Sequence, residues 1–233
     1  MNQLDGAKNN KVILFTGCTC VLGSYFVGNY GRSYTIVGIA RNAPYAYDGS
    51  YDFFKGDIIE DTDVIVNYVL EKYDKIDVLV NNAVMFDLIK LENKARGTFE
   101  REVKTNLIAP LELSNIILRN FWAKRSRKEN VFSGRCIINI TSISGTYFNC
   151  PGELASYSAL KVALNMFTKH MASGYAEYGV RVNAVAPATF PRYVSLERVG
   201  NAIIDLIEDN SNGAIMVLPD EDKNNDYLFE YKN

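Results

Sequence analysis

The segment TGCTCVLG, residues 16–23, combines residue types that could do three kinds of chemistry. Gly17 and Gly23 are spaced to form a turn in which backbone N–H groups and a helix N-terminus meet a phosphate group. Cys18 and Cys20 are separated by one residue and could provide two ligands to a metal ion. A cysteine that follows lysines and an apolar run is also the pattern of a lipoprotein signal. Features elsewhere in the chain are needed to distinguish a nucleotide loop from a metal site or a signal sequence.

Length and ligand count weaken the two alternatives to the nucleotide loop. The uninterrupted apolar run at residues 12–15 is far shorter than the roughly 7–15 apolar residues of a signal sequence. A metal site would need further ligands, and the chain offers only His170 and the distant cysteines Cys136 and Cys150. We therefore expect no metal, and we expect His170 to be a packing or surface residue.

Composition indicates one soluble domain in a reducing compartment. The 233 residues are 48% hydrophobic and 22% charged, which predicts a single domain over residues 1–233. No stretch approaches the ~18 apolar residues of a membrane span, and a net charge of −2 gives no general attraction for nucleic acid or anionic membranes. Four scattered cysteines are unlike the framework of a small secreted protein, which favours the cytoplasm. We expect residues 220–233 to form a flexible tail or to dock by their few aromatic side chains.

The hydrophobic pattern predicts the scaffold that positions these residues. Short runs rich in Val, Ile and Phe recur along the chain, and each ends in a polar, Gly or Pro break. The seven runs are residues 11–17, 34–41, 51–57, 76–83, 135–142, 180–187 and 214–219. Continuous apolar character is typical of parallel strands buried on both faces, and the segments between the runs have helical spacing. We therefore predict an α/β fold, a doubly wound and mostly parallel sheet of about seven strands with helices on both faces, which binds ligands at the carboxyl ends of its strands.

In this arrangement residues 16–23 follow the first strand and precede a segment at 24–31 that is able to start a helix, which favours the nucleotide loop.

Motifs at several strand ends together resemble the short-chain dehydrogenase/reductase family over nearly the whole chain. The family's TGxxxGxG motif aligns with residues 16–23, its NNAG motif with residues 81–84, and its acidic residue after the third strand with Asp57. The family's catalytic asparagine, serine and Y-x-x-x-K pair resemble Asn106, Ser142, Tyr157 and Lys161.

The resemblance implies hydride transfer between a nicotinamide and a carbonyl or alcohol. Reduction of a carbonyl develops negative charge on oxygen, so an acid must supply a proton, and a free tyrosine with a pKa near ~10 is too weak a base for the reverse step. Lys161 lies four residues after Tyr157, on the same helical face, where its charge would lower the pKa of the tyrosine. Ser142 would donate a hydrogen bond to the substrate oxygen, and Asn106 resembles the residue that holds a water in the family's proton relay.

The residue after the second strand selects between the two nicotinamide cofactors. A carboxylate there would bind the adenosine ribose diol, whereas an arginine can pair with a 2′-phosphate. Because Arg41 follows this strand, we predict NADP(H), with NADPH preferred over NADH. The resemblance also implies a set of cofactor contacts. They are Gly17, Cys18, Val21, Leu22, Gly23, Arg41, Asp57, Ile58, Asn82, Ala83, Tyr157, Lys161, Pro187 and Thr189.

The chain departs from the family pattern where three glycines are replaced, by Val21, Val84 and Ala188. A β-branched residue is poorly tolerated at positive φ, so Val21 would push a pyrophosphate outward. This departure favours a rival hypothesis, a non-catalytic nucleotide-binding or scaffold protein that keeps the fold. We prefer the enzyme, because all four reacting residues are present and a scaffold does not need them.

The region after the sixth strand bears on the substrate. Only residues 188–194 separate this strand from the next helix-like segment, so we expect an open cleft. Such a cleft suits a small-molecule carbonyl or one tethered to a carrier protein, and the basic run at residues 124–128 would meet an acidic carrier. The helix that contains Tyr157 is apolar around much of its circumference, which predicts a homodimer or homotetramer. We predict that the enzyme acts as a reductase.

Overall fold

Seven parallel strands form one sheet in the computed structural model, which describes residues 11–45, 47–147 and 152–220. The strands are β1 (Val12–Thr16), β2 (Thr35–Ala40), β3 (Asp52–Lys55), β4 (Val78–Asn81), β5 (Cys136–Ile140), β6 (Arg181–Pro187) and β7 (Ile215–Leu218). Their order is β3-β2-β1-β4-β5-β6-β7, the doubly wound order of a Rossmann-like sheet, and all neighbouring pairs are parallel. The predicted fold class and strands are confirmed. The predicted tail, apart from Asp220, and Cys150 lie outside the described residues.

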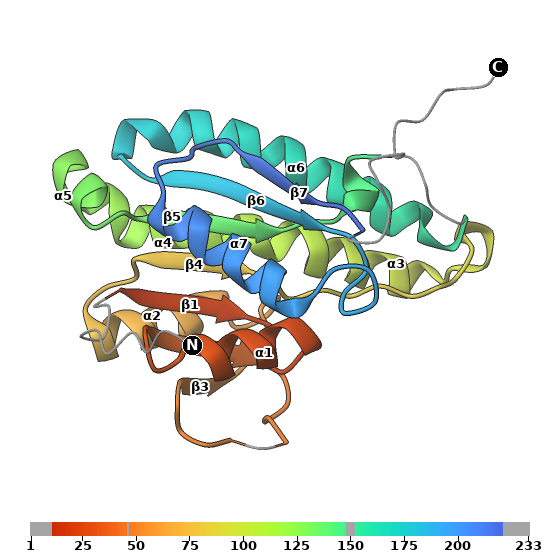
Figure 1. Ribbon diagram of the computed structural model, residues 1–233, viewed down its shortest axis with the longest axis horizontal. Helices are drawn as coiled ribbons and strands as arrows, with labels where there is room; N and C mark the ends of the chain where they lie inside the picture. Colours follow the sequence, from red (N-terminus) through yellow and green to blue (C-terminus); the bar gives the residue numbers. More distant parts are fainter. Residues whose placement is uncertain (1–10, 46, 148–151, 221–233) are drawn as a thin grey trace.

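Helices cover both faces of the sheet (Figure 1). One face is covered by α1 (Val21–Tyr30) and α7 (Leu196–Glu208), and the other by α2 (Thr62–Tyr73), α4 (Ala109–Asn120) and α6 (Ala155–Tyr175). The helices α3 (Arg96–Val103) and α5 (Arg127–Phe132) lie at opposite ends of the molecule. A π-helical turn at Lys104–Ile108 joins α3 to α4, and short 3₁₀ turns occupy Leu91–Asn93, Trp122–Lys124, Ile143–Gly145, Gly152–Leu154 and Ala176–Tyr178. Within the described parts of the chain, no helix has the length and apolar character that a bilayer crossing requires.

The side chains of β1 show why the strands are continuously apolar. Ile13 and Phe15 point into the core beneath α1 and α7, whereas Val12 and Leu14 point into the core beneath α2 and α4. All four side chains are buried. Because helices cover both faces of this central strand, neither face favours polar side chains, and each fully buried Val, Leu, Ile or Phe contributes roughly 1.5–3 kcal/mol of transfer free energy.

Helix α1 begins earlier than the pattern at residues 24–31 predicts. It starts at Val21, because the Cys20 side chain accepts a hydrogen bond from the backbone N–H of Gly23 at 3.4 Å and caps the helix. Val21 is therefore the first helical residue, with 58% of its surface exposed. Among the described non-glycine residues only Asp74 has a positive φ. The expectation that Val21 is strained at positive φ and pushes a pyrophosphate outward for that reason is wrong.

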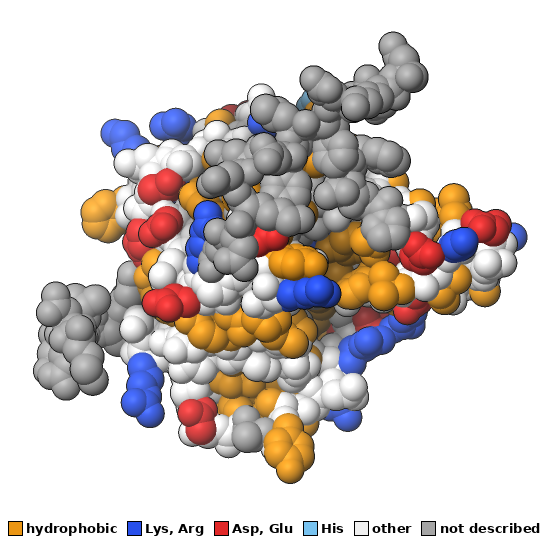
Figure 2. All heavy atoms as spheres, turned by 45° about the vertical axis from the view of Figure 1, so that its right-hand side comes forward, with side chains coloured by type: hydrophobic (Ala, Val, Ile, Leu, Met, Phe, Trp, Pro, Cys, Tyr) orange, Lys and Arg blue, Asp and Glu red, His pale blue; other side chains and the backbone are white. Residues whose placement is uncertain are grey.

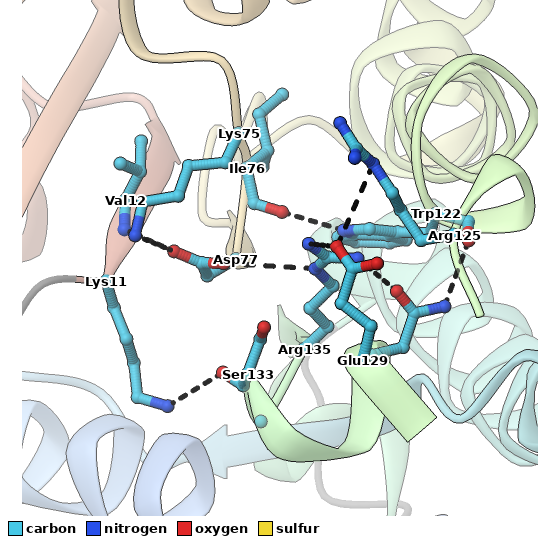
Figure 3. A network of polar contacts seen from close by, with 12 residues as sticks. Lys11, Val12, Lys75, Ile76, Asp77, Trp122, Arg125, Glu129, Ser133 and Arg135 are labelled. Atoms are coloured by element: carbon cyan, nitrogen blue, oxygen red, sulfur yellow. Dashed lines mark hydrogen bonds and ion pairs between the residues drawn. The ribbon is translucent and has the colours of Figure 1, made fainter. Parts of the chain in front are cut away.

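A buried polar network joins three strands at the amino edge of the sheet (Figure 3). The Asp77 carboxylate accepts a hydrogen bond from the backbone N–H of Val12 at 2.9 Å and lies 3.9 Å from Nε of Arg135. The Arg135 guanidinium also lies 3.2 Å from the Glu129 carboxylate and 4.6 Å from the centre of the Phe121 ring. These contacts connect the beginnings of β1, β4 and β5, at the edge opposite to the one where this fold binds ligands.

The basic run at residues 124–128 belongs to the same amino edge. Helix α5 begins within the run and precedes β5, so it lies at the end of the molecule opposite to α3 (Figure 1). Arg125 lies 4.9 Å from the centre of the Phe121 ring and 3.8 Å from the Glu129 carboxylate. A carrier protein bound to this run would meet the wrong edge of the sheet. The position of this run at the amino edge therefore argues against its predicted docking role.

Candidate active site

The loop after β1 and the segment after β4 form one structural unit. The Thr16 hydroxyl accepts hydrogen bonds from the backbone N–H groups of Asn82 and Ala83, each at 3.0 Å. The Asn82 amide donates in return to the carbonyl oxygens of Thr16 at 2.9 Å and Gly17 at 3.2 Å. Two motifs that are far apart in the sequence thus hold each other at the carboxyl edge of the sheet.

Two glycines of this loop have no room for a side chain. Gly17 has a φ of +71°, and a Cβ added there would lie 2.9 Å from the Cα of Ala83. A Cβ added to Gly23 would lie 2.1 Å from the carbonyl oxygen of Gly17. The close approach that these glycines allow places the N-terminus of α1 at the carboxyl edge, where its backbone N–H groups can bind a phosphate.

The two cysteines of the loop have separate structural roles. Cys18 is fully buried beneath α1, and burial raises the pKa of its thiol to about 12. Cys20 caps α1 and also lies 3.3 Å from the Asn82 amide nitrogen. Across the described residues, no group of three or more His, Cys, Asp or Glu side chains is placed to hold a metal ion.

A cavity at the carboxyl ends of β1 to β4 contains several predicted cofactor-binding residues. Its lining includes Gly17, Arg41, Asp57, Ile58 and Ala83. Arg41 is exposed and has no ion pair with any described residue, so its charge is available to an anionic ligand. An arginine, a carboxylate and a glycine-rich helix start fit the adenosine and phosphate groups of a dinucleotide.

The other predicted cofactor contacts lie beside this cavity rather than in its lining. The Leu22 side chain is fully buried in the core, and Val21 is exposed at the start of α1. Asn82 lies behind the loop and holds it. Pro187 is the last residue of β6, and Thr189 is exposed two residues beyond it.

The Y-x-x-x-K pair lies on α6, next to the end of β5. The ammonium group of Lys161 is buried, donates a hydrogen bond to the Ile140 carbonyl at 2.8 Å and lies 5.5 Å from the centre of the Tyr157 ring. Burial lowers the pKa of Lys161 to about 8, so the charged form still predominates at pH 7. Gly145 allows this packing, because a Cβ there would lie 2.7 Å from the backbone of Lys161.

Ser142 and Asn106 lie at the same edge. Ser142 follows β5, and its hydroxyl accepts a hydrogen bond from the backbone N–H of Ser144 at 3.1 Å, so its own proton can be donated to a ligand. Asn106 is buried in the π-helical turn, which packs against α6. Its side chain accepts a hydrogen bond from the Met85 N–H at 3.0 Å and donates one to the Met85 carbonyl at 2.5 Å. Asn106 thereby fixes the segment that follows β4. Single π-helical turns such as the one that contains Asn106 are frequent at functional sites.

An apolar segment beside Tyr157, residues 84–91, begins at the last residue of the 81–84 motif, and the rest of it belongs to none of the recognised motifs. The Phe86 ring centre lies 5.5 Å from that of Tyr157. The exposed apolar side chains of this segment are Val84, Phe86, Leu88, Ile89 and Leu91. Figure 2 shows hydrophobic side chains gathered among charged ones on the face seen when the α3 end of the molecule is turned forward. The sequence pattern that could have indicated this apolar surface is a segment after a strand whose apolar residues are interrupted only by Asp87 and Lys90.

Comparison with known proteins agrees with this geometry. The sequence model for the short chain dehydrogenase family matches residues 11–192. The chain belongs to the short-chain dehydrogenase family. It is 30% identical over 190 residues to galactitol 2-dehydrogenase of Agrobacterium fabrum, which covers 77% of this chain and 70% of that protein.

Two further comparisons define how far the similarity of this short-chain dehydrogenase extends. It is 31% identical over 141 residues to an uncharacterized oxidoreductase of Thermotoga maritima, and the alignment spans 60% of this chain but only 52% of that relative's length. A short chain dehydrogenase from Leptospira borgpetersenii, solved with bound NAD+, has a TM-score of 0.78 and 21% identity, covering 91% of this chain and 92% of that one. The structural similarity establishes the shared fold.

A buried ion pair fixes the apolar segment of this short-chain dehydrogenase against α6. The ammonium group of Lys94 lies 2.7 Å from the carboxylate of Glu102 in α3, and each side chain is 1% exposed. The Ser156 hydroxyl donates to Glu102 at 2.7 Å and accepts from Lys94 at 2.8 Å. Because Ser156 directly precedes Tyr157, these contacts hold the start of α6, α3 and the segment after β4 in one arrangement. The sequence motifs do not predict these buried contacts, because charged side chains such as those of Lys94 and Glu102 are usually exposed to solvent.

Proposed function

We propose that this protein is an NADP(H)-dependent oxidoreductase that reduces a ketone to an alcohol by hydride transfer. The observation that carries the proposal is that the four residues predicted to act in catalysis lie at the same carboxyl edge as the cavity lined by Gly17, Arg41 and Asp57. The four residues are Asn106, Ser142, Tyr157 and Lys161. When bound, the nicotinamide supplies the hydride.

The side chains of this site have different roles in the proton transfer that accompanies hydride transfer. Tyr157 gives its proton to the carbonyl oxygen, and the nearby charge of Lys161 stabilises the negative charge left on the phenol oxygen. Ser142 donates a hydrogen bond to the same carbonyl oxygen and orients it. Asn106 holds the segment after β4 and contributes to a water-mediated path for the proton.

The preference for NADPH over NADH rests on Arg41. Its guanidinium lines the cavity at the end of β2, where a 2′-phosphate would lie, and no described carboxylate neutralises it. The Leptospira relative was solved with NAD+, so family membership alone leaves the choice of cofactor open. The direct measurement is calorimetric titration with NADPH and NADH, with Arg41→Asp as the variant. Equal affinities in the wild-type protein would overturn this part of the proposal.

The activity itself is tested by replacing the proton donor. Tyr157→Phe should bind NADPH as the wild-type protein does and lose roughly 10²–10⁴-fold in turnover, because only the hydroxyl group that donates the proton is removed. NADPH consumption is followed with a panel of aliphatic ketones, sugar-derived ketones and 3-oxoacyl thioesters. A wild-type protein that binds neither cofactor would instead support the rival hypothesis of a non-catalytic scaffold protein. The helical backbone at Val21 removes the argument from strain that favoured this hypothesis.

The substrate is proposed to be a small-molecule or carrier-tethered carbonyl compound, and the assembly a homodimer or homotetramer. Leu160 and Leu164 of α6 face the core, whereas Val162, Met166 and Phe167 of the same helix are exposed. This second apolar face supports self-association, and light scattering after size-exclusion chromatography with Met166→Glu tests it. Buried free thiols such as Cys136 are consistent with the proposed cytoplasmic location.

A further inference from the structure

Arg101 reaches the nucleotide cavity from a part of the chain that no motif connects to the cofactor. It lies on α3, 44 residues after Asp57, yet its Nη2 is 2.7 Å from Oδ2 of Asp57. Both residues line the same cavity as Arg41. The cavity therefore contains two guanidinium groups, one of them paired with a carboxylate and one without such a partner among the described residues.

The pairing is not needed to orient Asp57. The backbone N–H of Asp57 donates to Asp61 at 2.8 Å, and its Oδ1 accepts from the backbone N–H of Ile59 at 3.0 Å, so the local turn already holds the carboxylate. The Arg101 side chain is 45% exposed, and exposed ion pairs contribute little to stability. The consequence of the contact is therefore local: it fixes the Arg101 side chain at the lining of the cavity and neutralises its charge.

We infer that Arg101 positions the adenine of the cofactor, with its planar guanidinium forming one wall of the base-binding slot while Asp57 holds it in place. This inference rests on the proposed function and assigns different tasks to the two arginines. Arg41, whose charge is uncompensated, recognises the 2′-phosphate. Arg101, whose charge is compensated, presents a flat face to the base, and guanidinium groups stack on aromatic rings in this way.

The two roles give different binding patterns, which isothermal titration calorimetry with NADPH and NADH can separate. Arg101→Met should weaken both cofactors to a similar extent, by about 5–10-fold, because the base is common to both. Arg41→Met should weaken NADPH by more than about 10-fold and leave NADH nearly unchanged. Arg101→Lys keeps the charge but lacks the planar face, so it should resemble Arg101→Met. Nicotinamide mononucleotide, which lacks adenosine, should bind all variants equally.

Arg96→Met is the matched control, because Arg96 lies on the same helix, is 92% exposed and pairs only with Glu100 among the described residues. It should leave both affinities unchanged, and thermal melting of each variant shows whether it folds. Unchanged binding in Arg101→Met, or a loss confined to NADPH, would overturn the assignment while leaving the proposed function intact. If the wild-type protein binds neither cofactor, the proposed function and this inference both fail.

Discussion

The ammonium group of Lys161 lies 5.5 Å from the centre of the Tyr157 ring and donates a hydrogen bond to the Ile140 carbonyl. One buried cation thus connects the end of β5 to the helix that carries the tyrosine. The arrangement places positive charge beside the proposed proton donor, and it requires an ammonium group to be held almost entirely out of water. The cost of burying the charged form lowers the pKa of Lys161.

The stability contribution of Lys161 should depend on pH. Burial lowers its pKa from the ordinary 10.5 to about 8, so between these pH values the unfolded chain binds more protons at this residue than the folded one. The free energy of unfolding of the wild-type protein should therefore rise relative to that of Lys161→Met as the pH increases through this window, by at most about 1.4 kcal/mol per pH unit. Urea denaturation of both proteins in a Tyr157→Phe background, at pH values from about 7 to 10, measures the difference. A difference independent of pH would contradict the lowered pKa.

Gly23→Ala should disrupt the nucleotide loop, whereas Gly28→Ala on the same helix should not. The added Cβ at Gly23 would lie 2.1 Å from the carbonyl oxygen of Gly17, but nothing lies within 4 Å of a Cβ at Gly28. We expect Gly23→Ala to melt at a lower temperature and to lose cofactor binding. Gly28→Ala should gain up to about 1 kcal/mol from helix propensity. Calorimetry and thermal melting measure both effects, and similar behaviour of the two variants would refute the steric argument.

Restoring the family's glycine with Val21→Gly should not improve cofactor binding. Val21 is the first residue of α1, has an ordinary helical backbone and directs its side chain to solvent. Glycine in a helix is less favourable than most residues, so the variant should lose up to about 1 kcal/mol of stability. NADPH titration checks the prediction. A tenfold or larger gain in affinity would show that the valine side chain obstructs the phosphate after all.

Glu102→Gln should be far more destabilising than Glu100→Gln in the same helix. The first variant leaves the buried ammonium group of Lys94 without its charged partner, at a cost of about 3–5 kcal/mol. The second removes an exposed pair with Arg96, which contributes about 0.5 kcal/mol or less. Urea denaturation gives both values. The double variant Lys94→Met, Glu102→Leu should recover most of the lost stability, because an apolar pair can replace a buried ion pair. Equal costs for the two single variants would mean that Lys94 is solvated.

The sequence by itself determined the elements and the order of the motifs. Unbroken apolar runs such as residues 12–15 indicate burial on both faces of a strand, and this alone predicts a parallel sheet covered by helices. A spacing of four places Tyr157 and Lys161 on one helical face without any knowledge of their neighbours. Short-range periodicity suffices for such conclusions because each depends only on the geometry of one element.

Only the tertiary structure decided which side chains meet. The pairing of Arg101 with Asp57, the burial of Lys94 beside Glu102 and the position of the run at 124–128 on the amino edge all depend on where distant elements pack. The helical start at Val21 depended on a cap supplied by Cys20, a residue whose type suggests a metal or a disulfide. Periodicity specifies which face of an element is apolar. It does not specify how deeply that face is covered or which element covers it, because sheet order and long-range packing set both.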